Sequence, residues 1–279
     1  MPPWLETIGV LVLANISVVL GLLTTKIKNR TWLVCYIPPL ILIILIALTR
    51  HIYKLVFYPP FSWLTEGRIE YVVFSITLPM IFSILIPRLS LLRQKIILTI
   101  FVAISSVVFF VIPFISPIFI KEELEDIKTE FSSNGICLQS TDYTCGPAAA
   151  ATALYQFGIK ANEGELAILA YTTPQTGTSD DLLKKAIENK YGSEGIVCTY
   201  RCFDSISELK GNCPVIVVTR FSFLIDHYVT VMEVTGNQVV IGNPATGKEV
   251  LTYKEFQKKW RSVGIVVKKK DNLNSISQL

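Results

Sequence analysis

Four polar residues in the second half of the chain have the types and the order that thiol chemistry requires. Cys145 precedes Gly146-Pro147, and His227 is the only histidine beyond residue 51. Gln139 stands six residues before this cysteine, and Asn243 stands sixteen residues after this histidine. A cysteine thiolate attacks acyl carbon atoms, and a neighbouring imidazole can remove the proton from the thiol. The sequence therefore predicts a site in which Cys145 is the nucleophile and His227 is the base.

The residues that follow Cys145 favour its reactive form. Gly146-Pro147 and four successive alanines predict the first turn of a helix. The free amides and the positive dipole end at a helix N-terminus favour a thiolate, and an adjacent imidazole would complete an ion pair. The alanines would let this helix pack closely against the strand that carries His227. Taken alone, Cys145 could be an ordinary buried cysteine and His227 a structural histidine.

Gln139 and Asn243 supply the other two functions of such a site. The amide of Gln139 and the backbone N–H of Cys145 could together stabilise the oxygen that gains charge in a tetrahedral intermediate. The side-chain oxygen of Asn243 could accept a hydrogen bond from the imidazole and fix its tautomer. Separately, these two residues could also be a loop glutamine and an Asn-Pro turn.

The hairpin that would join His227 to Asn243 needs an irregularity. An ideal hairpin that turns at Gly236-Asn237 sets His227 opposite Thr246. The pairing that the site requires therefore predicts either a β-bulge or a turn centred nearer Thr235.

Apolar spacing around these residues predicts helices first and an antiparallel sheet afterwards, which defines an α+β domain. Expected helices start at Gly146-Pro147 and end before Gly158, and cover 162–171 and 179–191. A short helix over 253–260 should place Phe256 and Trp260 on one face. Strands are expected over 196–202, 214–221, 227–235, 238–243, 248–252 and 263–268.

Three segments carry a resemblance to a known family. Cys137-Leu-Gln-Ser-Thr-Asp-Tyr-Thr-Cys145-Gly-Pro, Asp226-His-Tyr-Val and Gly242-Asn-Pro-Ala-Thr-Gly247 resemble the bacteriocin-processing cysteine peptidases of the papain-like superfamily. The likeness covers about residues 137–268. In that family a peptidase domain cuts leader peptides after a double glycine.

The resemblance implies a role for each candidate residue. Cys145 corresponds to the nucleophile, His227 to the base, Gln139 to the oxyanion donor and Asn243 to the third member. The family usually has aspartate at the third position, and Asn243 should orient the ring without helping to charge it. Family members commonly belong to export transporters with an ATPase domain, whereas four apolar stretches precede the domain here, so a leader-peptide substrate is left open.

The first 120 residues have the composition of a membrane region. Hydrophobic residues make up 51% of the 279 residues and are concentrated between residues 8 and 120. Four stretches approach the roughly 20 apolar residues that a bilayer-spanning helix needs, at about 8–25, 32–49, 69–87 and 96–120. We expect a transmembrane region over 1–120, a linker over 121–136, the papain-like domain over 137–270 and a tail over 271–279.

Basic residues predict the orientation of these helices. The connections 26–31 and 88–95 hold three basic residues each, which favours the cytoplasmic side for both. The chain is then an integral protein of a bacterial inner or plasma membrane, with its peptidase domain outside the cytoplasm. In that oxidising compartment four cysteines could form two disulfides or remain buried thiols. These are Cys137, Cys198, Cys202 and Cys213.

Several other classes of function lack support in the sequence. No paired Cys or Cys/His spacing suits zinc, and we expect neither a metal nor another cofactor. The formal charge is +4, and the only basic run in the second half, 268–270, is typical of a solvated strand end rather than of nucleic-acid binding. Residues 242–248 imitate a P-loop, but Glu249 follows where Ser or Thr is needed, so no ATP is expected.

Together these features predict a membrane-anchored cysteine peptidase that acts on exported peptides or proteins through a Cys-His-Asn mechanism. Two alternatives use the same residues or the same fold. One is a papain-like amidase or acyltransferase that acts on a non-protein substrate, which cleavage of a peptide library would distinguish. The other is a non-enzymatic, membrane-anchored binding module.

Overall fold

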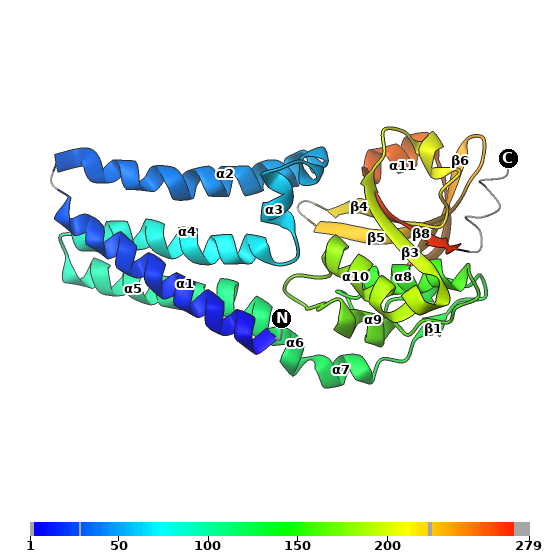
Figure 1. The fold of residues 1–279 in the computed structure, drawn as a ribbon, viewed down its shortest axis with the longest axis horizontal. Helices are drawn as coiled ribbons and strands as arrows, with labels where there is room; N and C mark the ends of the chain where they lie inside the picture. The colour runs from blue at the N-terminus through cyan, green and yellow to red at the C-terminus, as the bar shows by residue number, and fades with distance from the viewer. Residues whose placement is uncertain (1–2, 28, 223–224, 271–279) are drawn as a thin grey trace. The chain divides into compact units, whose positions relative to one another are not determined.

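A computed structural model describes residues 3–27, 29–222 and 225–270, which form two compact units, Met1–Phe119 and Ile120–Leu279 (Figure 1). The predicted tail over 271–279 lies outside the described residues.

The first unit is helical. Its helical elements in chain order are α1 (Pro3–Leu23), η1 (Thr24–Lys26), η2 (Asn29–Tyr36), α2 (Ile37–His51), η3 (Tyr53–Phe57), α3 (Phe61–Thr65), α4 (Ile69–Leu85), η4 (Ile86–Arg88), α5 (Leu92–Ser106), the π-helical η5 (Val107–Val111) and α6 (Ile112–Phe119). Among the described residues, four stretches are long and apolar enough to cross a membrane: Pro3–Lys26, Arg30–Thr49, Ile69–Arg88 and Leu92–Phe119. They coincide with the four stretches that the sequence predicts.

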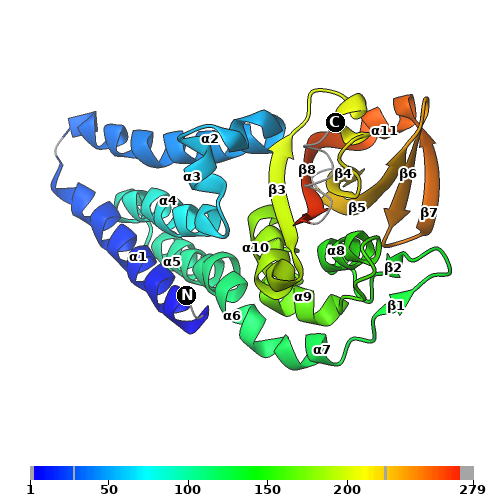
Figure 2. The same cartoon turned by 45° about the vertical axis from the view of Figure 1, so that its right-hand side comes forward.

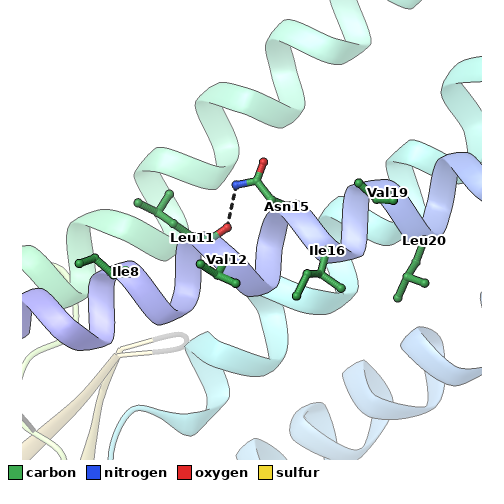
Figure 3. A pocket seen from close by; sticks show the side chains of 7 residues that line it. All are labelled: Ile8, Leu11, Val12, Asn15, Ile16, Val19 and Leu20. Carbon is green, nitrogen blue, oxygen red and sulfur yellow. Dashed lines mark hydrogen bonds between the residues drawn. The ribbon is translucent and has the colours of Figure 1, made fainter.

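Small and hydroxyl-bearing residues let α1 and α4 pack closely. A side chain at Gly21 would begin 2.1 Å from the Ser83 hydroxyl. Asn15 and Ser17 weaken the apolar character of α1, but each hydrogen bonds to a carbonyl oxygen four residues earlier. Figure 3 shows the Asn15 bond to Leu11 beside an otherwise apolar hollow on α1. Because each side chain donates a hydrogen bond within the helix, these residues are compatible with a membrane span.

Arginine side chains tie α1 to α4 at both ends. Arg68, just before α4, forms an ion pair with Glu6 near the start of α1. Arg88, just after α4, donates to the carbonyl oxygen of Thr24 at 2.9 Å and lies over the Trp32 ring. Because the starts of α1 and α4 contact each other and so do their ends, the two helices run parallel.

The second unit has helices followed by a sheet, which confirms the α+β class. Its elements in chain order are α7 (Lys121–Glu125), β1 (Glu130–Phe131), β2 (Cys137–Leu138), α8 (Cys145–Tyr155), α9 (Glu163–Leu169), α10 (Asp180–Tyr191), η6 (Gly192–Glu194), β3 (Ile196–Cys202), η7 (Ile206–Leu209), β4 (Val215–Ser222), β5 (Ile225–Val234), β6 (Gln238–Asn243), β7 (Gly247–Thr252), α11 (Tyr253–Lys259) and β8 (Trp260–Lys269). Among the described residues six strands form an antiparallel sheet in the order β3-β8-β4-β5-β6-β7.

The sheet buries both faces. Figures 1 and 2 show α8, α9 and α10 gathered on one side of it. On that side the Thr230 hydroxyl of β5 donates to the Ala149 carbonyl oxygen of α8 at 2.7 Å. On the other side Val229 and Val231 of β5 join a buried apolar cluster that includes Phe256 of α11. The alternation along β5 therefore sends successive side chains to opposite layers, as a two-sided core requires.

Two predicted boundaries differ from the structure. Residues 121–136, expected as a linker, contain α7 and β1, and Leu124 of α7 is buried. Trp260, expected to end the helix over 253–260, is extended and begins β8, although its ring still contacts Phe256 at 5.3 Å between centroids. Both elements depend on contacts with distant residues, which local spacing does not reveal.

No disulfide joins any of the six cysteines, all of which lie in the described part of the chain. The two disulfides that the sequence allows among Cys137, Cys198, Cys202 and Cys213 are therefore absent from the structure. Cys137 and Cys198 are buried, and burial raises the pKa of each thiol to about 12.

Candidate functional site

The helix that carries Cys145 is fixed by small side chains and by two buried hydroxyl groups. The five alanines of α8 are fully buried, which allows close approach of the sheet. The Thr152 hydroxyl accepts from the Cys137 backbone N–H at 3.0 Å and donates to the Ala148 carbonyl oxygen at 3.0 Å. With the bond from Thr230 to Ala149, these contacts hold α8 against both β2 and β5.

Cys145 is the first residue of α8, as the sequence predicts for a residue at a helix start. Burial raises the pKa of its thiol, and the backbone N–H groups of Tyr228, Gly146 and Cys145 itself act in the opposite direction. Tyr228 lies beyond the last β5–β6 pair, Thr230 with Gly242. The backbone next to His227 thus approaches the sulfur of Cys145 and supplies it with a hydrogen-bond donor.

His227 and Asn243 are in direct contact. His227 Nε2 and Asn243 Oδ1 lie 2.8 Å apart. The β5–β6 hairpin turns at 235–238, and its register shifts by one residue between Val231 and Glu233. The sequence predicts either a bulge or a displaced turn, and the structure contains the bulge.

The bulge decides on which face of the sheet Asn243 lies. With the same turn and no extra residue at Met232, Asn243 would pair with Thr230, whose side chain points to α8. With the bulge, Thr230 pairs with Gly242, and Asn243 shares the face of Val229 and His227. A one-residue change of register transfers a side chain to the opposite face, so the bulge is what makes the contact between His227 and Asn243 possible.

Glu249 fixes which atom of Asn243 faces the imidazole. Asn243 Nδ2 donates to Glu249 Oε1 at 2.7 Å, and Asn243 Oδ1 also accepts the Ala245 backbone N–H at 3.0 Å. A carboxylate only accepts hydrogen bonds, so Nδ2 must face Glu249 and Oδ1 must face His227. His227 Nε2 then carries the proton, and Nδ1 of the neutral ring keeps its lone pair.

The protonation of the two central groups follows mainly from burial. Burial lowers the pKa of His227, and the hydrogen bond that His227 donates to Asn243 and the charge of Glu249 oppose this. Burial likewise raises the pKa of Cys145. Both directions favour a neutral thiol and a neutral imidazole rather than the ion pair that the helix N-terminus suggests.

Gln139 lies next to the loop that follows Asn243. Its backbone N–H donates to the Pro244 carbonyl oxygen at 2.9 Å. Its side-chain Nε2 donates to the Thr141 carbonyl oxygen at 2.9 Å, and its Oε1 is buried without a hydrogen-bond partner among the described residues. One N–H of the amide is thereby engaged within the loop, and the second is left for another acceptor.

Sequence reasoning missed two carboxylates that support this arrangement. Glu163, at the start of α9, is fully buried and accepts from both the backbone N–H and the hydroxyl of Ser140, at 2.8 and 2.7 Å. Glu249 contacts Asn243 as described. The alternation of β6 and β7 around the turn at 244–246 could have placed Glu249 on the face of Asn243, but no local pattern marks Glu163.

The part of the chain that the structure describes contains no group of three His, Cys, Asp or Glu side chains that could hold a metal ion. Residues 242–248, which imitate a P-loop, form the β6–β7 hairpin.

Comparison with known proteins adds three findings. The model of the Peptidase C39 family matches residues 133–272. An uncharacterised protein of Methanothermobacter marburgensis is 29% identical over 150 residues, which cover 54% of this chain and 99% of that protein. Two solved structures are similar over the second half. A double glycine motif protease from an AMS/PCAT transporter, in complex with the leader peptide, has 19% identity and a TM-score of 0.42, with 51% of this chain and 92% of that chain covered. The peptidase domain of Streptococcus ComA, a bifunctional ABC transporter involved in quorum sensing, has 23% identity and a TM-score of 0.42, with 47% and 96% covered.

Proposed function

This chain belongs to the Peptidase C39 family, and from this premise we propose that it is a membrane-anchored cysteine peptidase. Cys145 is the nucleophile, His227 the base, Asn243 the residue that orients the base, and Gln139 an oxyanion donor. The observation that supports this assignment best is the contact from His227 Nε2 to Asn243 Oδ1. It leaves Nδ1 as the proton acceptor that a thiol nucleophile needs.

Acylation begins with proton transfer from the Cys145 thiol to His227 Nδ1. Because burial favours the neutral forms of both groups, this transfer accompanies attack of the sulfur on the peptide carbonyl carbon. The backbone N–H of Cys145 and the free amide N–H of Gln139 stabilise the oxyanion of the tetrahedral intermediate.

The intermediate collapses when the C–N bond breaks. His227 returns the proton to the leaving amine, and a thioester to Cys145 remains. A water molecule, deprotonated by His227, then attacks the thioester, releases the carboxylic acid and restores the thiol.

A labelling experiment on the full chain in detergent micelles tests the roles of the cysteine and the histidine. A thiol-directed epoxide should label Cys145, and His227→Ala should slow this labelling by roughly 100-fold, the usual contribution of a general base. His51→Ala is the matched control, since it removes the other histidine of the chain. Equal labelling rates in His227→Ala and His51→Ala would remove His227 from the mechanism.

A peptide library tests the class of substrate. We expect the wild type to cleave a subset of peptides and Cys145→Ser to cleave none, with double-glycine leader peptides included as one group. If Cys145 is labelled but no peptide is cleaved, a papain-like amidase or acyltransferase becomes the better assignment. If neither reaction occurs, the domain is a binding module.

The orientation in the membrane is part of the proposal. The basic connections 26–31 and 88–95 support a cytoplasmic location for both, which puts the second unit outside the cytoplasm. A membrane-impermeant protease added to intact cells should then digest residues 137–268. Protection of this segment would place the peptidase in the cytoplasm.

A further inference from the structure

A carboxylate lies one hydrogen bond behind the His227–Asn243 pair. In the β6–β7 hairpin Asn243 pairs with Gly247 and Ile241 pairs with Glu249, so Glu249 lies on the same face of the sheet as Asn243. Its Oε1 accepts from Asn243 Nδ2 at 2.7 Å and from the Thr246 hydroxyl at 2.5 Å. His227, Asn243 and Glu249 therefore form a continuous chain of hydrogen bonds across three strands.

We propose that Glu249 is a positioning residue of this site, which holds Asn243 with its oxygen toward His227 and supplies the negative charge behind the base. The inference rests on the peptidase function proposed above. When His227 accepts the thiol proton, its ring becomes a cation, and Asn243 has no charge with which to stabilise it. Glu249 supplies this charge through the amide of Asn243, whose dipole is aligned by the same hydrogen bond.

Among the described residues, the other groups around His227 are neutral or paired. From β4, the Phe221 ring lies 5.6 Å from the imidazole, and the Thr219 hydroxyl donates to the His227 carbonyl oxygen. Asp226, next along β5, accepts two hydrogen bonds from Arg261 of β8, at 2.9 and 2.8 Å.

Glu249 is thus the carboxylate whose charge acts on the imidazole. In agreement, this charge raises the pKa of His227 against the effect of burial.

The titration of His227 tests the charge directly. The chain has two histidines, so ring 13C labelling of the full chain in micelles gives two signals, which His51→Gln assigns. In Glu249→Gln, which keeps the shape and an acceptor oxygen, the midpoint of His227 should move to lower pH. Glu233→Gln is the control, since it removes an exposed carboxylate from β5 and should leave the midpoint unchanged. Equal midpoints in the two variants would overturn the proposal.

Moving the negative charge from position 249 to position 243 distinguishes an effect of the charge from a structural role of Glu249. In Asn243→Asp/Glu249→Gln the carboxylate contacts the imidazole itself, and the glutamine amide introduced at position 249 can donate to it. This double variant should raise the midpoint at least to that of the wild type. If the midpoint stays at the value of Glu249→Gln, the charge is not what Glu249 contributes. The double variant also gives an answer where Glu249→Gln alone fails to fold.

A double-mutant cycle tests whether Glu249 acts through Asn243. The epoxide should label Cys145 about tenfold more slowly in Glu249→Gln, the factor expected when a charge several ångströms from the imidazole is lost. In an Asn243→Ala background the same change should matter by less than about twofold, because contacting residues are not additive. An equal factor in both backgrounds would contradict the proposal. The two proposals can fail separately. If the wild type cleaves no peptide but Glu249→Gln shifts the midpoint of His227, the peptidase function is refuted. If the wild type cleaves peptides but Glu249→Gln leaves the midpoint of His227 unchanged, the role of Glu249 is refuted.

Discussion

The buried carboxylate of Glu163 should control both the stability of the second unit and the geometry of the loop that carries Gln139. It accepts two hydrogen bonds from Ser140, at 2.8 and 2.7 Å, and its own backbone N–H donates to the Thr129 hydroxyl at 2.8 Å. The side chain is at 0% exposure. A buried charge is tolerated only when it is well hydrogen bonded. A movement of Ser140 would therefore leave the buried carboxylate of Glu163 without these two hydrogen bonds.

The cost of losing this charge follows from the two bonds. Hydrogen bonds to a charged group contribute about 1.5–3 kcal/mol each and neutral ones about 1 kcal/mol. Glu163→Gln can keep both contacts in neutral form and should destabilise the unit by about 1–4 kcal/mol. Glu163→Ala removes both acceptors and leaves a cavity, so about 3–5 kcal/mol is expected.

Denaturant unfolding of the full chain in micelles measures the stability, and epoxide labelling of Cys145 under native conditions reports the loop. Glu165→Gln is the matched control on the same helix. Its carboxylate pairs with Lys190, and both side chains are more than 40% exposed, so it should cost less than about 1 kcal/mol. Equal stabilities of Glu163→Gln and Glu165→Gln would refute the energetic reasoning. Lower stability with an unchanged labelling rate would refute the link to the site.

Two further changes test the packing and the electrostatics of the second unit. Gly164→Ala should destabilise the second unit by about 3 kcal/mol, because the new Cβ would lie 1.9 Å from the Leu124 carbonyl oxygen. Gly192→Ala, which has open space at its Cβ, should be near neutral in the same melting experiment. Equal melting temperatures of the two variants would show that α7 does not pack on α9. Burial raises the pKa of Asp180 to about 6, and the hydrogen bond from Tyr228 opposes this. The protonated carboxyl group therefore stabilises the folded state fully below about pH 4, and this stabilisation is lost as the pH rises through about 6. Unfolding free energies should therefore fall relative to Asp180→Asn by up to about 3 kcal/mol over that range, and parallel pH profiles would contradict the raised pKa.

Elements with strong periodicity are predicted closely from the sequence, and elements held by distant contacts are not. Strand β3 and helix α10 begin and end within a residue of the predicted 196–202 and 179–191, since each has a buried stripe and a clear boundary residue. The five residues of α7 have no comparable stripe. Leu124 is buried, and Gly164 of α9, which has no side chain, lets the backbone of α7 approach closely at Leu124. That approach depends on a glycine far along the chain, and no window of local sequence contains both residues.

The candidate site shows the same division. Cys145, His227 and Asn243 can be chosen from the sequence because their side chains have an intrinsic chemistry and stand in a familiar order. The register between His227 and Asn243 can be reduced to two solutions, a bulge or a displaced turn, but the hydrophobic pattern of β5 alone does not select the bulge at Met232. In the sequence, Glu249 is notable only because it stands where a P-loop needs Ser or Thr. Its contact with Asn243 depends on the register of the β6–β7 hairpin, which a sequence motif does not contain.

The position of Asn243 also depends on the helix that bears Cys145. A side chain at Gly242 would begin 3.0 Å from Thr152 Cγ2 and 3.1 Å from Ile136 Cγ1, so β6 touches α8 at a point where little more than a hydrogen atom fits. Thr152 lies two turns along α8 from Cys145, and its hydroxyl is bonded to both α8 and β2. Because the interior of a protein transmits small changes of volume, a larger residue at 242 would move Asn243 relative to both Cys145 and His227. The spacing between the candidate nucleophile and the residue that orients the base is therefore set by packing on α8, and the hairpin supplies only the side chain.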